Sequence, residues 1–296
     1  MGLRTATAKS RNSSREVSST AQAARNIAKG VLLLGGLVAI LTALGWWIGG
    51  VRLAVFFFVV GALIAGMSYW HGPRILLGSV GARELLLAEA PALHATVEQL
   101  AVRAGVPRPR LFLMTDGHPR SLAVGRGAHG AAIAVSQGLL SMSTPAELEG
   151  VLAHELAHVR HRDVIVQTPV VVLAGALVEA SRIGGFLERA LLFVLGPVAA
   201  ALVHVIVSPK RELDADRAAA EICGSPHGLA DALIRLEQAI ELVEFRASPV
   251  TEPLYIVNPF ADEGLATLFA THPPIGERVQ RLRALDPDWR EKLRAA

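Results

Sequence analysis

Long stretches without charged side chains are the feature that most restricts how this 296-residue chain can fold. Residues 30–51 contain no charged residue. As a helix they would be about 33 Å long, enough to span a hydrocarbon core of about 30 Å. Residues 53–73 form a second such stretch after the single charge of Arg52. We therefore predict a transmembrane helical hairpin over residues 30–73, with a tight turn at residues 49–51. A cleaved signal peptide fits less well, because its apolar region is shorter, about 7–15 residues.

The charges on either side of this hairpin predict its orientation. Residues 1–29 carry six basic side chains against one glutamate, and the rest of the chain is slightly acidic. The positive-inside rule, applied to this tail and to Arg74 and Arg83, places both ends of the hairpin in the cytoplasm. We expect a basic cytoplasmic tail that contacts anionic lipid. Nucleic-acid binding is not indicated, because no aromatic side chains accompany the charges. The single cysteine, Cys223, excludes an intramolecular disulfide and is expected to be buried.

A helix beginning at Thr144 carries the strongest chemical signal in the sequence. The Thr144 hydroxyl can cap the helix, and Glu147, three residues later, completes a capping box. His154 and His158 lie four residues apart, so one helix face presents both imidazoles to a single ion. Glu155 lies beside them, where it can take a proton from a water molecule. The alternative is a chance match on an amphipathic helix, which a third ligand would argue against.

The third ligand is expected on a later helix that opens with Ser208 and Pro209. Glu212 is the candidate, because a catalytic zinc site takes three protein ligands and keeps one position open for water. Asp216 lies one turn further on, where it can accept a hydrogen bond from the far nitrogen of a ligand histidine. Without the preceding histidine pair, a charged helix face with ordinary ion pairs would explain this segment better.

The remaining pattern predicts a mixed domain. We expect a helix around Leu93–Ala101, a strand at Leu111–Met114, and two extended segments, Ser121–Val124 and Ala131–Ser136, joined by the glycine-rich loop Gly125–Gly130. This loop lacks the lysine of a phosphate-binding loop and precedes a strand, so phosphate binding is not indicated.

Two further uncharged runs lie within residues 164–209, at 164–178 and 190–209. They are either a second membrane hairpin or buried helices of the catalytic domain. Basic residues on both flanks favour the hairpin.

Three motifs together are similar to those of a known group. HELAHVRHRD at 154–163, RELDAD at 211–216 and FATHPPIGERVQRL at 269–282 resemble the HtpX-type and CAAX prenyl protease type 1 family of integral-membrane zinc endopeptidases, closest to its bacterial HtpX-type proteins. The resemblance covers roughly residues 80–285. One departure is Pro119-Arg120-Ser121-Leu122-Ala123, where the family usually has Pro-Asn-Ala-Phe-Ala, and it puts substrate contacts in doubt at that point.

The resemblance implies a role for each site residue. It implies that His154, His158 and Glu212 bind one Zn²⁺, that Glu155 is the general base and that Asp216 supports the site. It also implies that His272 and Arg278 approach the metal, where they stabilise the oxyanion and hold the carboxylates. His161 is expected to be solvated. Finally, it implies an exposed sheet edge that pairs with an extended peptide, formed by Ala131, Ala132, Ile133, Ala134, Val135 and Ser136.

These observations define one expectation. The fold class is α+β and mainly helical, with a zincin-like metalloprotease domain at residues 80–296 that contains a small sheet and is interrupted by the hairpin at 164–209. The protein is expected to be a multi-pass protein of the inner or plasma membrane with a cytoplasmic catalytic domain, cleaving membrane or misfolded polypeptides in quality control. Prenyl-peptide processing is an alternative. A non-catalytic scaffold is another, although its ligand set should be broken, and a transporter is disfavoured because the first two spans contain no Asp, Glu, Lys or Arg. No feature of the sequence indicates an oligomeric state.

Overall fold

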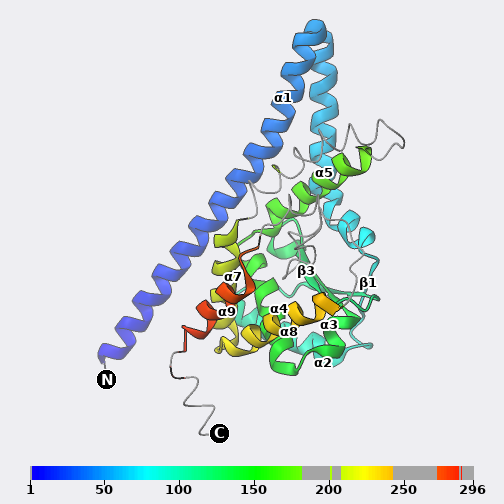
Figure 1. Ribbon diagram of the computed structural model, residues 1–296. Coiled ribbons are helices and arrows are strands. Elements are labelled where there is room, and N and C mark those ends of the chain that lie inside the picture. The colour runs from blue at the N-terminus through cyan, green and yellow to red at the C-terminus, as the bar shows by residue number, and fades with distance from the viewer. Residues whose placement is uncertain (1, 182–200, 202–207, 243–271, 287, 289–296) are drawn as a thin grey trace.

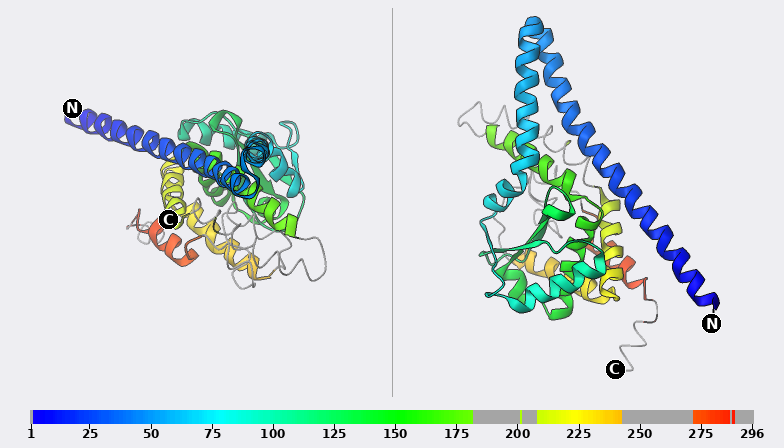
Figure 2. Two further views of the ribbon diagram at one scale, coloured as in Figure 1. Left: turned by 90° about the horizontal axis from the view of Figure 1, so that it is seen from above. Right: turned by 180° about the vertical axis from the view of Figure 1, so that it is seen from behind.

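The structure is a computed structural model that describes residues 2–181, 201, 208–242, 272–286 and 288. A long helical hairpin rises from one end of a mixed helical and sheet body (Figure 1). In the views from above and from behind, the first arm of the hairpin continues beyond its partner, along and past that body (Figure 2). The α+β, mainly helical fold class expected from the sequence is confirmed for the part of the chain that the structure describes.

The hairpin is α1 (Gly2–Ser79), in which the helix breaks at Gly49 and Gly50. Gly50 has φ 66° and ψ −154°, a conformation open only to glycine. The predicted turn at 49–51 coincides with this break. The arms pack closely, since a Cβ atom on Gly61 would lie 3.5 Å from the Cα atom of Val38. Large apolar side chains such as Trp47, 83% exposed, face outward, as expected of a helix surrounded by lipid.

The segment Ala24–Ser79 within α1 is long and apolar enough to cross a membrane, and an 18-residue window within it has a mean hydropathy of 2.3. Because the segment folds back at Gly50, each arm is long enough to cross a hydrocarbon core of about 30 Å once.

Four short strands form one sheet in the order β1-β2-β4-β3. They are β1 (Ala82–Glu84), β2 (Arg110–Met114), β3 (Ser121–Val124) and β4 (Ala132–Ser136). β2 and β4 are parallel, and the two outer pairings are antiparallel.

The expectation of an exposed edge at Ala131–Ser136 is wrong. β4 is hydrogen-bonded to β2 on one side and to β3 on the other, and all of its residues are buried. A run such as Ala132–Ser136, with almost no polar residue, is typical of a strand covered on both faces. The outer strand on this side of the sheet is β3.

Helices cover both faces of the sheet, and the side chains of the strands alternate between two apolar cores. Ala123, Ile133 and Val135 belong to a core formed with α2 (Pro91–Ala104), α4 (Pro145–Arg160), α7 (Pro209–Cys223) and α8 (His227–Leu242). Leu122 and Val124 point to the opposite core, formed with α5 (Val164–Ser181) and the end of α1. The shorter helices are η1 (Ala128–Gly130), α3 (Gln137–Met142) and α9 (Ile275–Arg283).

The first of the two uncharged runs, residues 164–178, lies in α5, a helix of the folded domain. Val166, Val170 and Ala174 of α5 are buried in the core that also contains Leu122. α5 turns away from α4 by 93°. It packs against both arms of α1, at Gly30 on the first and Gly72 on the second. The other half of the predicted second hairpin, residues 182–200 and 202–207, lies outside the described residues, so this membrane crossing stays a prediction.

Candidate metal centre

The helix that carries the histidine pair is fixed at its start and along its length. The capping box is present: Glu147 N donates to Thr144 Oγ1 at 3.3 Å, and Thr144 N donates to Glu147 Oε2 at 2.7 Å. Further along α4, Gly150 lets α8 approach so closely that a Cβ atom there would lie 2.5 Å from Leu229 N. These contacts set the direction in which the last two turns of α4 present their side chains.

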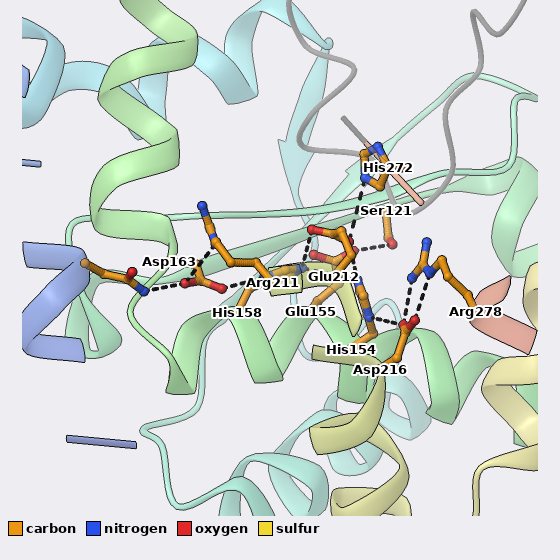
Figure 3. Close-up of polar contacts among 11 residues, drawn as sticks. Ser121, His154, Glu155, His158, Asp163, Arg211, Glu212, Asp216, His272 and Arg278 are labelled. Atoms are coloured by element: carbon orange, nitrogen blue, oxygen red, sulfur yellow. Dashed lines mark hydrogen bonds and ion pairs between the residues drawn. The ribbon is translucent and has the colours of Figure 1, made fainter. Parts of the chain in front are cut away.

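His154, His158 and Glu212 come together as the sequence predicts (Figure 3). The Nε2 atoms of the two histidines lie 3.2 Å apart. Glu212 Oε2 is 3.4 Å from His154 Nε2, and Glu212 Oε1 is 3.6 Å from His158 Nε2. Ligands about 2.0–2.1 Å from a tetrahedral zinc ion are separated from each other by about 3.3 Å, so the two nitrogens and the Glu212 carboxylate fit one ion.

The three ligand side chains are buried, and a buried charge costs free energy unless it is paired. Burial raises the pKa of Glu212, but His158 and His272 outweigh it and hold that pKa well below its usual range. Glu212 is therefore an ionised carboxylate, the form that binds a cation. Among the residues that the structure describes, none makes a hydrogen bond to its Oε2 atom. A buried, ionised oxygen beside two imidazole nitrogens is the chemistry of a metal ligand set.

Asp216 holds His154 from behind, as expected. Asp216 Oδ1 lies 3.0 Å from His154 Nδ1, which leaves Nε2 directed at the ligand group. The guanidinium of Arg278 donates to both oxygens of Asp216, at 2.7 and 2.8 Å. Burial raises the pKa of Asp216, but Arg278 outweighs it and lowers that pKa to about 2. Of the two roles that the resemblance implied for Arg278, holding a carboxylate fits this geometry.

Asp163 does the same for His158, and the sequence analysis assigned it no role. Asp163 Oδ2 lies 2.9 Å from His158 Nδ1, and Asp163 Oδ1 lies 3.3 Å from Arg211 Nε. Burial raises the pKa of Asp163, and Arg211 and His158 overcome this and lower it. The chain reverses just after α4, with Arg162 at φ 58°, and this brings Asp163 back beside the histidine. The signal was the final Asp of HELAHVRHRD, one turn beyond the helix end.

Glu155 contacts a strand residue that the sequence analysis also missed. Ser121 Oγ, on β3, donates to Glu155 Oε1 at 2.6 Å, and both side chains are buried. Burial raises the pKa of Glu155, which brings a carboxylate closer to the range useful for accepting and returning a proton. Ser121 lies in the segment 119–123, where the sequence departs from the pattern usual in the family that it resembles.

His272 lies close to the ligand group, next to Glu212, as expected (Figure 3). Its Nε2 atom is 3.7 Å from Glu212 Oε2, and its side chain is 4% exposed.

The expectation for a second histidine is wrong: His161, predicted to be solvated, is only 8% exposed. It is the C-cap residue of α4 and directly precedes the chain reversal at Arg162.

Two imidazoles and a carboxylate around one point, with a buried glutamate beside them, define the class of metallopeptidases. Residues 87–286 match Peptidase family M48. A "Protease HtpX homolog" of Acidiphilium cryptum is 41% identical over 278 residues, covering 87% of this chain and 96% of that protein. One of Pyrococcus abyssi is 39% identical over 271 residues, covering 86% and 94%. A solved structure titled "Crystal Structure of S. mikatae Ste24p" is 17% identical and covers 90% of this chain and 66% of that one, with a TM-score of 0.47.

The chain belongs to peptidase family M48. It is a membrane-bound metalloprotease, with its apolar hairpin at one end of the catalytic body.

Proposed function

We propose that this protein is a zinc-dependent endopeptidase of the cell membrane whose catalytic domain faces the cytoplasm. The observation that carries the proposal is the convergence of His154, His158 and Glu212 at the spacing of one tetrahedral ion. Nitrogen and carboxylate ligands of this kind suit zinc. When bound there, zinc supplies Lewis-acid polarisation of a carbonyl and of water.

The other residues divide the work of peptide hydrolysis. Glu155, fixed by Ser121 and with its pKa raised by burial, accepts a proton from water and returns it to the leaving amine. His272, close to Glu212, is placed to donate to the oxyanion of the tetrahedral intermediate. Arg278 holds Asp216, and so keeps His154 in the orientation that binds metal.

The test separates metal binding from proton transfer. Glu155→Gln keeps the shape of the side chain but cannot accept a proton, so purified protein should contain about one zinc per chain and lose roughly 10²–10⁴-fold in turnover. Glu212→Ala should lose zinc. Parent-like cleavage of casein by Glu155→Gln, or parent-like zinc affinity in Glu212→Ala, would overturn these roles.

The position of β3 suggests how a polypeptide substrate is held. Ser136 N donates to Arg120 O, so Arg120 and Ser136 form a hydrogen-bonded pair across β3 and β4. Hydrogen-bonded and non-hydrogen-bonded pairs alternate in an antiparallel ladder, so the backbone groups of Ser121 and Ala123 point away from β4. An extended peptide can pair with this edge. The edge lies beside Glu155, because Ser121 belongs to β3 and its side chain donates to the Glu155 carboxylate.

Ala123→Pro tests this arrangement. It removes one outward-facing amide and leaves the ladder to β4 intact, as proline on an outer strand can. The Michaelis constant should rise several-fold while zinc content stays at the parent value. Ala123→Ser keeps the amide and is the matched control. An unchanged Michaelis constant in Ala123→Pro would place the substrate elsewhere.

The hairpin supports a membrane-associated substrate class. α5 packs against both arms of α1, so the catalytic body is held beside the bilayer rather than on a long tether. We infer a duty in quality control, in which membrane or misfolded polypeptides are cleaved close to the membrane surface. Cleavage of a membrane-inserted test protein in vesicles, against the same protein with its span deleted, tests this preference.

A further inference from the structure

Asn26 is a buried polar residue in a stretch of α1 that is otherwise largely exposed. Its side chain is 7% exposed, whereas its neighbours Arg25 and Lys29 are exposed. It lies four residues, about 6 Å along the helix, before the uncharged run that begins at Gly30. A buried amide costs free energy unless it is hydrogen-bonded, so its partners are informative.

Both partners of the Asn26 amide belong to the chain reversal that follows α4. Asn26 Nδ2 donates to Asp163 Oδ1 at 2.6 Å and to the carbonyl oxygen of His161 at 3.0 Å. An amide nitrogen has two hydrogens, so both are used. The other oxygen of Asp163, Oδ2, lies 2.9 Å from Nδ1 of the ligand His158.

The Asp163 carboxylate therefore connects the membrane helix to the metal centre. Asn26 holds one oxygen, and the second oxygen is thereby turned toward His158. The Arg211 guanidinium lies 3.3 Å from the same oxygen, Asp163 Oδ1, and forms an ion pair with it. Arg211 belongs to α7, whereas Asn26 reaches this oxygen from α1. Close packing of α1 on α5 keeps the amide in place, since a Cβ atom on Gly30 would lie 3.2 Å from Val166.

We propose that Asn26 is a positioning residue of the metal centre, and that docking of the first arm of α1 onto residues 161–163 completes the site. This inference rests on the proposed zinc function. It makes the membrane anchor part of the catalytic apparatus, because the orientation of His158 depends on a residue at the point where the chain approaches the bilayer. Loss of a residue that supports a ligand in this way weakens metal affinity or activity about 10–100-fold. Asn26 acts through Asp163, so we expect about tenfold.

The experiment uses the full chain in detergent or in lipid nanodiscs. Asn26→Leu keeps the approximate volume and the helix but removes the amide. Arg25→Leu, on the exposed face next to it, is the matched control. The dissociation constant for zinc, measured by competition with a chromophoric chelator, should rise about tenfold in Asn26→Leu and stay at the parent value in Arg25→Leu.

Two further measurements separate positioning from loss of fold. The visible absorption spectrum of the cobalt-loaded protein reports ligand geometry and should change in Asn26→Leu, whereas the circular dichroism and elution volume of the variant should match the parent. In the background of Asp163→Asn, where the carboxylate is already lost, Asn26→Leu should have little further effect on zinc affinity, because the two residues act in series.

The outcomes are distinct. Parent protein that binds no zinc would refute the proposed function. Parent protein that binds zinc, with Asn26→Leu equal to it in affinity and cobalt spectrum, would refute the role of Asn26 alone. Fully additive effects of Asn26→Leu and Asp163→Asn would also refute it, since they would mean that Asn26 does not act through Asp163.

Discussion

The hydrogen bond from Ser121 to Glu155 leads to a quantitative prediction for Ser121→Ala. The bond is 2.6 Å long, buried, and made to a carboxylate. Hydrogen bonds to charged groups contribute about 1.5–3 kcal/mol, and about 1.4 kcal/mol corresponds to a factor of ten in rate. If the bond fixes the carboxylate for proton transfer, its loss should lower kcat by about 10- to 100-fold. That is less than the loss from Glu155→Gln, because the base itself remains.

The assay is cleavage of a fluorogenic peptide well below the melting temperature, with zinc measured in the same samples. Ser136→Ala is the matched control, because Ser136 is an equally buried serine of the neighbouring strand. Its hydroxyl accepts from Arg120 N and Leu139 N, each at 3.0 Å, and does not contact Glu155. Both variants should melt at a lower temperature, but only Ser121→Ala should lose turnover at full zinc occupancy. Equal turnover in the two variants would refute the reasoning.

Three further predictions concern other parts of the molecule. Gly150→Ala would place a Cβ atom 2.5 Å from Leu229 N and should lower the free energy of unfolding by about 1–3 kcal/mol, whereas Gly175→Ala, in open space on α5, should be neutral or stabilising in the same thermal melt. Burial raises the pKa of the Cys223 thiol to about 11, so alkylation by iodoacetamide should be slow at pH 8 and should accelerate only as the pH approaches 11. A reporter inserted at Gly50, the turn of the hairpin, should be external and one at the C-terminal end cytoplasmic; the same side for both would contradict the orientation.

The ligand set could be predicted because its spacing is local or strongly signalled. His154 and His158 share a helix face whatever the rest of the chain does, and Glu212 lies in the first turn of a helix whose start is marked by Ser208 and Pro209. The helix start at Thr144 could be predicted for the same reason, because its capping residues are close together in the sequence. The side chain of Ser208, however, makes no capping hydrogen bond, so a residue type preferred at helix starts located the boundary without forming the bond.

The residues that sequence analysis missed act across long separations. Ser121 is 34 residues from Glu155, and Asn26 is 137 residues from Asp163, so no periodicity relates them. The place of β4 in the sheet was also misjudged, because strand order is decided by how the elements pack. The nearly continuous apolar character of Ala132–Ser136 was a local indication of a central strand, since an edge strand with a solvated face alternates.

The residues of the metal centre lie far apart in the sequence, and this has a consequence for biosynthesis. Both histidines are synthesised well before Glu212, and Arg278, which clamps Asp216, is synthesised later still. Domains fold as units once their sequence has emerged from the ribosome. A growing chain therefore carries both histidines before the carboxylate that completes the ligand set has been synthesised. The three-ligand site can form only after α7 has been synthesised, so an unfinished chain that lacks Glu212 cannot yet act as a metallopeptidase.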